Sequence, residues 1–183
     1  MVTKTHLVVG AIILFSLLQL LSLGQPATLV FDENHYVKTA RMVSLGYPDY
    51  NIEHPPLGKR IIATSINFLG DSPWGWRVPS FLFSIATLIL TFSLARNFLG
   101  EKTALLAGFL LALDPLWIVV SRLGMLDIFA TFFAVLFVAL TLRYLDKPSI
   151  KLAVFSGVAL GVSLAVKWVG ITLPLFFALI VGI

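Results

Sequence analysis

The chain has 183 residues, of which 58% are hydrophobic and only 12% are charged, and its mean hydropathy is +0.97. A soluble domain is about half apolar and about a quarter charged, so this composition excludes one and predicts an integral membrane protein. The formal net charge of +4 comes without any basic run, which argues against a nucleic-acid partner. The chain has no cysteine, so disulfides and thiolate metal sites are excluded.

The first apolar segment covers residues 7–23. It is at the lower end of the length needed for a spanning helix and is long for the core of a signal peptide. The sequence Ser22-Leu23-Gly24 would serve as a cleavage context, which leaves a signal peptide open. We expect an uncleaved first transmembrane helix, because further apolar segments follow.

A long loop at residues 24–76 separates the first apolar segment from the second, and it contains two amphipathic helical patterns. The first pattern covers residues 33–45 and is stopped by Gly46-Tyr47-Pro48. The second covers residues 57–68, with Pro56 placed to begin the helix. Each pattern carries an apolar stripe, which predicts two helices lying flat at the membrane interface.

Further apolar stretches occur at residues 78–99, 103–120, 128–144, 152–166 and 171–183. Each is near the length that crosses about 30 Å of hydrocarbon, and none shows the alternation of barrel strands. Asp114-Pro115 interrupts one stretch and should kink or end that helix. The sequence therefore predicts an all-α integral membrane protein, a polytopic bundle of about six transmembrane helices forming one domain over residues 1–183.

The basic residues of the short loops predict the orientation. With a cytoplasmic N-terminus, one side of the membrane holds Lys4, Arg96, Lys102, Arg143, Lys147 and Lys151. The long loop also carries basic residues, so the positive-inside rule supports this topology only if that loop is exported as a folded unit. We therefore expect a cytoplasmic N-terminus and an extracytoplasmic long loop.

Four short motifs carry a resemblance to a known family. They are FDENHY at 31–36, HPPLGK at 54–59, RLGMLD at 122–127 and VKWVG at 166–170. Their order and spacing resemble those of protein O-mannosyltransferases, the dolichyl-phosphate-mannose–protein mannosyltransferases of the GT-C superfamily. The acid pair Asp32-Glu33 is a weak signal alone, whereas HPPLGK is much more specific, and the resemblance covers essentially the whole chain.

The resemblance implies a GT-C-type membrane enzyme that transfers mannose from a polyprenyl (dolichyl) phosphate to Ser or Thr hydroxyls outside the cytoplasm, without a cofactor. A hydroxyl needs a positioned base as its proton leaves, and the resemblance gives that role to Asp32 in a single inverting displacement. Glu33 would hold the acceptor or orient Asp32. The expected partners are the lipid-linked donor, a protein or other hydroxyl acceptor and membrane lipid, and a partner chain or a dimer stays open.

Departure of a lipid phosphate requires positive charge near the interface. The substrate-binding candidates in the motifs and at the membrane edge are His54, Lys59, Arg77, Arg122, Asp127, Lys167 and Trp168. The four cations would contact the phosphate, whereas His54 could bind the phosphate, the sugar or Glu53. Asp127 would bind the sugar or pair with Arg122. No set of His, Asp and Glu residues has the spacing of metal ligands.

Each candidate also has a structural alternative. Asp32 and Glu33 could cap the loop helix, and Lys59 and Lys167 could be interfacial lysines that extend toward water. Arg122 with Asp127 could be a structural pair, and Trp168 could belong to an interfacial aromatic belt.

Two other functions stay open at this stage. One is another GT-C transferase, of the aminoarabinose type, and the other is a non-catalytic membrane subunit or lipid-phosphate transporter. Members of the family that it resembles are longer, so we expect the domain to be incomplete at its C-terminus. We expect the protein in a prokaryotic, archaeal, plasma membrane.

Overall fold

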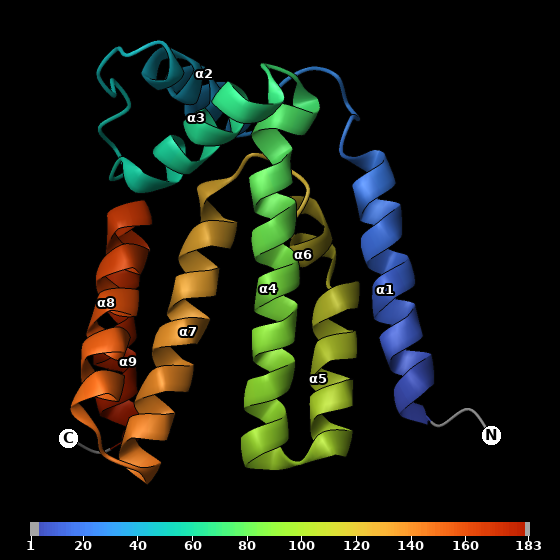
Figure 1. The fold of residues 1–183 in the computed structure, drawn as a ribbon, viewed down its shortest axis with the longest axis vertical. Helices are drawn as coiled ribbons and strands as arrows, with labels where there is room; N and C mark the ends of the chain where they lie inside the picture. The colour runs from blue at the N-terminus through green and yellow to red at the C-terminus, as the bar shows by residue number, and fades with distance from the viewer. Residues whose placement is uncertain (1–3, 182–183) are drawn as a thin grey trace.

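The computed structural model of the chain describes residues 4–181, and the regular structure in that part is helical. Two short helices, α2 (Glu33–Ser44) and α3 (Leu57–Leu69), form a cap across one end of a bundle of roughly parallel helices (Figure 1). The bundle consists of α1 (Lys4–Ser22), α4 (Pro73–Leu99), α5 (Glu101–Leu113), α6 (Pro115–Val120), α7 (Leu126–Asp146), α8 (Ile150–Val166) and α9 (Thr172–Val181), with the 3-10 helix η1 (Trp168–Ile171) between α8 and α9.

Helix α4 lies in the middle of the bundle and contacts α5, α7 and the cap helix α3. It begins at Pro73, where the Ser72 hydroxyl accepts a hydrogen bond from Gly75 N at 3.3 Å. Inside the helix, the buried Thr87 hydroxyl donates back to Phe83 O at 2.7 Å. That polar group is therefore satisfied within its own helix and needs no water.

The predicted interruption at Asp114-Pro115 is confirmed. The apolar stretch 103–120 is divided between α5 and α6, and Asp114 between them is extended, with φ −64° and ψ 124°. Its carboxylate accepts a hydrogen bond from Trp117 N at 2.7 Å, while Pro115 has no N–H to continue α5. Asp114 thus ends one helix and caps the next.

Two helices of the described residues, α4 with 27 residues and α7 with 21, are long and apolar enough to cross a membrane. The described apolar part of α1 and the whole of α8 are shorter. Helix α9 covers most of the last predicted stretch, whose final two residues lie outside the described part. The helical class is confirmed and is consistent with a membrane protein. The count of six spans and the interfacial position of α2 and α3 stay predictions.

The cap packs on the bundle through the apolar stripes that the sequence predicts. The buried residues of this contact are Tyr36, Val37 and Ala40 of α2, Ile62, Ala63 and Ile66 of α3, and Leu126, Phe129 and Val166 of the bundle. The approach is closest at Gly58, where a Cβ would lie 2.7 Å from Leu126 Cδ2 and 3.2 Å from Val166 Cγ1. The glycine of HPPLGK therefore lets α3 lie directly on α7 and α8.

Candidate active site

Side chains from all four motifs meet beneath the cap. The charges of Asp32 and Asp127 are near enough to raise the pKa of the Tyr36 hydroxyl. The charges of Lys167 and Asp127 are near enough to shift the pKa of the His54 ring. These residues come from the start of α2, the loop before α3, the start of α7 and the end of α8. The fold thus assembles one polar cluster, Asp32, Tyr36, His54, Asp127 and Lys167, from segments far apart in the sequence.

Asp32 occupies the position just before α2, but its carboxylate makes no capping hydrogen bond to that helix. In the described structure its Oδ2 accepts a hydrogen bond from Tyr36 Oη at 3.5 Å, a long distance, and no ion pair engages it. The side chain is half-buried. The capping alternative therefore does not describe Asp32, whose carboxylate keeps free acceptor capacity.

Tyr36 belongs to this cluster, although in the sequence it is only one residue of the helical pattern at 33–45 and not a predicted site residue. Its pKa is raised, first by burial and then by the neighbouring charges of Asp32 and Asp127. The phenol therefore stays protonated and acts as a donor. The signal that could have identified it is its spacing, since Tyr36 lies four residues after Asp32 on one helix face.

His54 lies beside Tyr36, with ring centroids 6.0 Å apart. Its Nδ1 is buried and has no hydrogen-bond partner among the described residues. Burial and the nearby cation Lys167 lower the pKa of the ring, which favours the neutral imidazole near pH 7. A neutral imidazole with an unused nitrogen can donate a hydrogen bond to a bound ligand or accept one from it.

Asp127 and Lys167 join the start of α7 to the end of α8. Lys167 Nζ donates to Asp127 Oδ1 at 2.7 Å. The Lys167 side chain is 18% exposed and the Asp127 side chain is 40% exposed. Among the described residues Asp127 pairs with Lys167, and no ion pair joins it to Arg122, which was one of the alternatives considered from the sequence. A cavity of about 120 Å³ adjoins the pair and is lined by Asp127, Thr131, Ser163, Gly170 and Thr172, among others.

Glu33 and Arg77 form a fully buried ion pair. Arg77 Nε and Nη2 each donate to a Glu33 oxygen at 2.8 Å, and Gly124 N donates to the same carboxylate at 2.8 Å. The remaining N–H groups of Arg77 donate to backbone carbonyls of Leu23, Pro26 and Thr28.

A guanidinium has five N–H groups, and those of Arg77 all have acceptors. The expected phosphate contact of Arg77 and the expected acceptor contact of Glu33 are therefore revised. The geometry gives both residues a structural role, joining the start of α2 to α4.

Lys59 is also fully buried and fully engaged. Its ammonium group donates to Asp49 Oδ2 at 2.6 Å, to His54 O at 2.8 Å and to Asn51 O. Three donors thus meet three acceptors, and none is left for a ligand. The assignment of Lys59 to the donor phosphate is revised in the same way, because this lysine holds the loop that carries His54.

The two other candidates lie apart from these contacts. Arg122 Nη1 contacts Ser22 Oγ of α1 at 3.5 Å, and its Nε is buried without a partner among the described residues. Trp168 is 58% exposed and follows Lys167 directly. Within residues 4–181, no group of three or more His, Asp or Glu side chains is arranged to hold a metal ion.

The sequence was compared with known proteins. The profile of a family described as dolichyl-phosphate-mannose-protein mannosyltransferase matches residues 53–182. Curated relatives named polyprenol-phosphate-mannose–protein mannosyltransferase are 30% identical in Corynebacterium glutamicum, 30% in Mycobacterium tuberculosis and 28% in Mycolicibacterium smegmatis. The alignments cover 83%, 87% and 90% of this chain.

The same alignments cover only 36%, 36% and 38% of the relatives, so the chain spans little more than a third of their length. These relatives are bacterial, which agrees with the prokaryotic origin that we expected and gives no support to an archaeal one. No solved structure matches the chain significantly.

Proposed function

Because the chain belongs to the dolichyl-phosphate-mannose-protein mannosyltransferase family, we propose that it transfers mannose from a polyprenyl phosphate to Ser or Thr hydroxyls of proteins. The names of its relatives support the lipid-linked donor and the protein acceptor. The observation that carries the proposal is the Asp32 carboxylate, which within residues 4–181 neither caps a helix nor joins an ion pair, and which lies in a cluster that also contains Lys167.

In this proposal Asp32 is the general base of a single inverting displacement. The acceptor oxygen attacks C1 of mannose, the bond from C1 to the phosphate oxygen breaks, and the acceptor proton passes to Asp32. The polyprenyl phosphate leaves with the bonding electron pair. Tyr36 supports the base, because its protonated hydroxyl donates to one carboxylate oxygen and leaves the other free.

Lys167 is the cation that we assign to the leaving phosphate. It is mostly buried, and an ammonium in such a place interacts strongly with an anion. Asp127 fixes the position of Lys167 through the 2.7 Å contact, and one carboxylate oxygen stays available for a sugar hydroxyl. His54, as a neutral imidazole, and the exposed Trp168 complete the substrate contacts.

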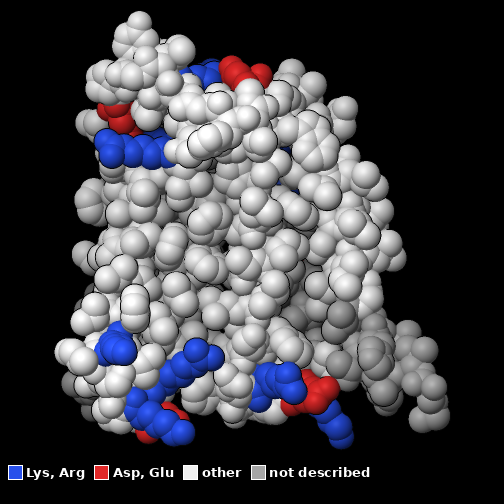
Figure 2. All heavy atoms as spheres, viewed as in Figure 1, with Lys and Arg blue, Asp and Glu red and all other residues white. Residues whose placement is uncertain are grey.

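The charge distribution supports an active site on the extracytoplasmic side. Figure 2 shows Lys and Arg gathered at the end of the molecule opposite the cap and also present at the cap end, with a largely uncharged band between the two ends. The exposed basic residues at that end are Arg96, Lys102, Arg143, Lys147 and Lys151. If the long loop, which also carries basic residues, is exported as a folded unit, the positive-inside rule makes that end cytoplasmic, with the helices of the bundle as about six membrane crossings.

Asp32→Asn tests the proposal. The amide has nearly the shape of the carboxylate but cannot accept the proton, so transfer from polyprenyl-phosphate mannose to a Ser/Thr peptide should fall 10²- to 10⁴-fold. The melting temperature should not change, because the carboxylate stabilises no helix end.

The control is Asp71→Asn, which alters an exposed carboxylate paired with Arg41 at 2.9 Å and should leave the rate near normal. Near-normal turnover of the Asp32→Asn protein would remove Asp32 from the mechanism.

A further inference from the structure

Phe31, the residue directly before the proposed base Asp32, has a backbone conformation that its residue type does not favour. Its φ is +48°, in the left-handed region, where bulky residues are uncommon and glycine is tolerated without strain. Within residues 4–181, no other residue apart from glycines has a positive φ. Strain of this kind persists only where the surrounding structure imposes it, and it is concentrated at functional sites.

The buried pair of Glu33 and Arg77 imposes this conformation. Val30 N donates to Glu33 Oε2 at 3.1 Å, and Glu33 N donates back to Val30 O at 3.1 Å. Arg77 Nη2 donates to Thr28 O at 3.2 Å and to Glu33 at 2.8 Å. The backbone on both sides of Phe31 is thus fixed by a fully buried ion pair, and the turn does not depend on the Phe31 side chain.

The Phe31 side chain contributes little to the fold. It is 72% exposed, and it belongs neither to the buried core nor to the residues packed against that core. The ring pairs of the described residues do not include it. Its carbonyl accepts hydrogen bonds from Asn34 N and Nδ2 at 3.2 and 3.1 Å, which any residue would do. Glycine would satisfy this turn without strain, so the exposed ring requires another explanation, and contact with a ligand supplies one.

The position beside Asp32 indicates which substrate the ring meets. In a single displacement the acceptor attacks C1 opposite the leaving phosphate, so the acceptor lies on the side of Asp32 and the phosphate on that of Lys167. One carbon separates the hydroxyl of Ser or Thr from its Cα, so the acceptor backbone must come close to Asp32. Consecutive Cα atoms are about 3.8 Å apart, and an extended peptide advances about 3.3 Å per residue. A side chain that flanks the acceptor residue is therefore within reach of Phe31.

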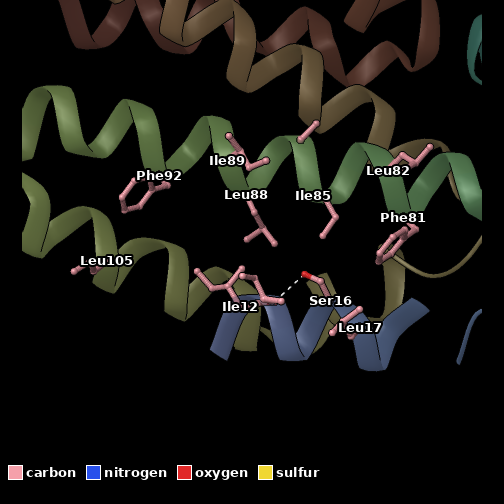
Figure 3. A pocket seen from close by; sticks show the side chains of 12 residues that line it. Ile12, Ser16, Leu17, Phe81, Leu82, Ile85, Leu88, Ile89, Phe92 and Leu105 are labelled. Carbon is pink, nitrogen blue, oxygen red and sulfur yellow. Dashed lines mark hydrogen bonds between the residues drawn. The ribbon is translucent and has the colours of Figure 1, made fainter. Parts of the chain in front are cut away.

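The apolar groove of about 620 Å³ between α1 and α4 does not provide an alternative site for a peptide. Its walls include Ile12 of α1, Ile85 of α4 and Leu105 of α5 (Figure 3). A peptide carries amides that need hydrogen-bond partners. The one hydroxyl among the residues that line the groove, Ser16 Oγ, already donates to Ile12 O at 2.8 Å, as the dashed line in Figure 3 shows.

We propose that Phe31 is a specificity-determining contact for the acceptor peptide, and that its ring binds an apolar side chain next to the Ser or Thr that receives the sugar. This inference rests on the proposed function, since the base Asp32 places the acceptor. Covering an exposed aromatic ring removes apolar surface from water, and aromatic residues are enriched among those that dominate binding energy. The rigid turn adds to the affinity, because its backbone loses no freedom when the peptide binds.

The test compares two labelled peptides that differ only at the residues on either side of a single Thr, which are Leu in one peptide and Gly in the other. Their dissociation constants are measured by fluorescence anisotropy in detergent, and mannosyl transfer is measured in parallel. The unaltered protein should bind the Leu peptide about tenfold more tightly. Phe31→Gly should bind the two peptides equally, with an unchanged KM for the donor. Its melting temperature should not fall, because glycine accommodates the positive φ.

Two matched variants serve as controls. Phe31→Tyr keeps the ring and should keep the preference for the Leu peptide. Phe68→Ala removes a ring of α3 that is 83% exposed and should also keep it. Equal binding of the two peptides by the unaltered protein, an unchanged preference in Phe31→Gly, or a change confined to the KM for the donor would overturn the proposal. A preference that Phe31→Gly abolishes, in a protein that transfers no mannose, would support the peptide contact and contradict the proposed function.

Discussion

The ionisable side chains beneath the cap differ in how far their hydrogen-bonding capacity is used. Glu33, Lys59 and Arg77 are fully buried, and each is surrounded by opposite charge or backbone partners. A buried charge is tolerated only when it is paired in this way, so these residues stabilise the cap. Asp32 and His54 keep hydrogen-bonding atoms without a partner among the described residues. Both side chains are half-buried, so these atoms are the ones that can form hydrogen bonds with a substrate.

Lys59→Met should impair folding of the cap rather than only substrate affinity. Loss of the ammonium leaves Asp49 and two backbone carbonyls without their donor, and removing one member of a buried pair costs about 3–5 kcal/mol. Thermal unfolding in detergent measures the change. Arg60→Met, at the exposed neighbouring position, should stay within about 0.5 kcal/mol of the unaltered protein. Equal, small effects of the two substitutions would contradict the structural role of Lys59.

The His54 ring should make the protein less stable as the pH falls. Its pKa is lowered in the folded state from the ordinary value of 6.5, so the unfolded chain takes up a proton first. Above pH 6.5 the ring is neutral in both states and does not lower the free energy of unfolding. As the pH falls from 6.5 toward the folded pKa, protonation of the unfolded chain lowers that free energy. Melting temperatures between pH 8 and pH 5 should therefore decline more steeply for the unaltered protein than for His54→Gln. Parallel curves would show that His54 does not contribute to the decline.

At the scale of elements, the position of the cap depends on the close contact of α3 with α7 and α8. Gly58→Ala would place a Cβ 2.7 Å from Leu126 Cδ2, and overpacking of this kind costs about 1–3 kcal/mol. Gly157→Ala on α8 is the matched control, because no atom outside its own helix segment lies within 4 Å of the added Cβ. That substitution should be neutral or stabilise the helix by up to about 1 kcal/mol. Unfolding curves of both variants measure the contrast, and an equally stable Gly58→Ala protein would argue against a tightly packed cap.

At the scale of the whole molecule, the cap and the basic end should lie on opposite sides of the membrane. The chain has no cysteine, so single introduced thiols report their position without background. Tyr50→Cys, at an exposed loop position in the cap, should react with an impermeant thiol reagent added to intact cells. Lys147→Cys, in the turn between α7 and α8, should react only after the membrane is permeabilised. The reverse pattern would contradict the orientation.

The sequence by itself determines the helical membrane class, the family and most helix positions. Continuous apolar runs can only become helices in a bilayer, and local signals such as Asp114-Pro115 end a helix through the chemistry of one or two residues. The apolar stripes at residues 33–45 and 57–68 likewise indicated which faces of α2 and α3 are buried. These properties are local, so they can be inferred without knowing which segments meet.

Only the tertiary structure decides which charged residues hold the fold and which remain available. Arg77 meets Glu33, 44 positions earlier in the chain, and Lys167 meets Asp127, 40 positions earlier. From the sequence, Lys59, Arg77, Arg122 and Lys167 are four similar cations at a membrane edge. Their roles differ because the pairing of a charge depends on distance in space and on burial, and both are set by how the cap packs on the bundle.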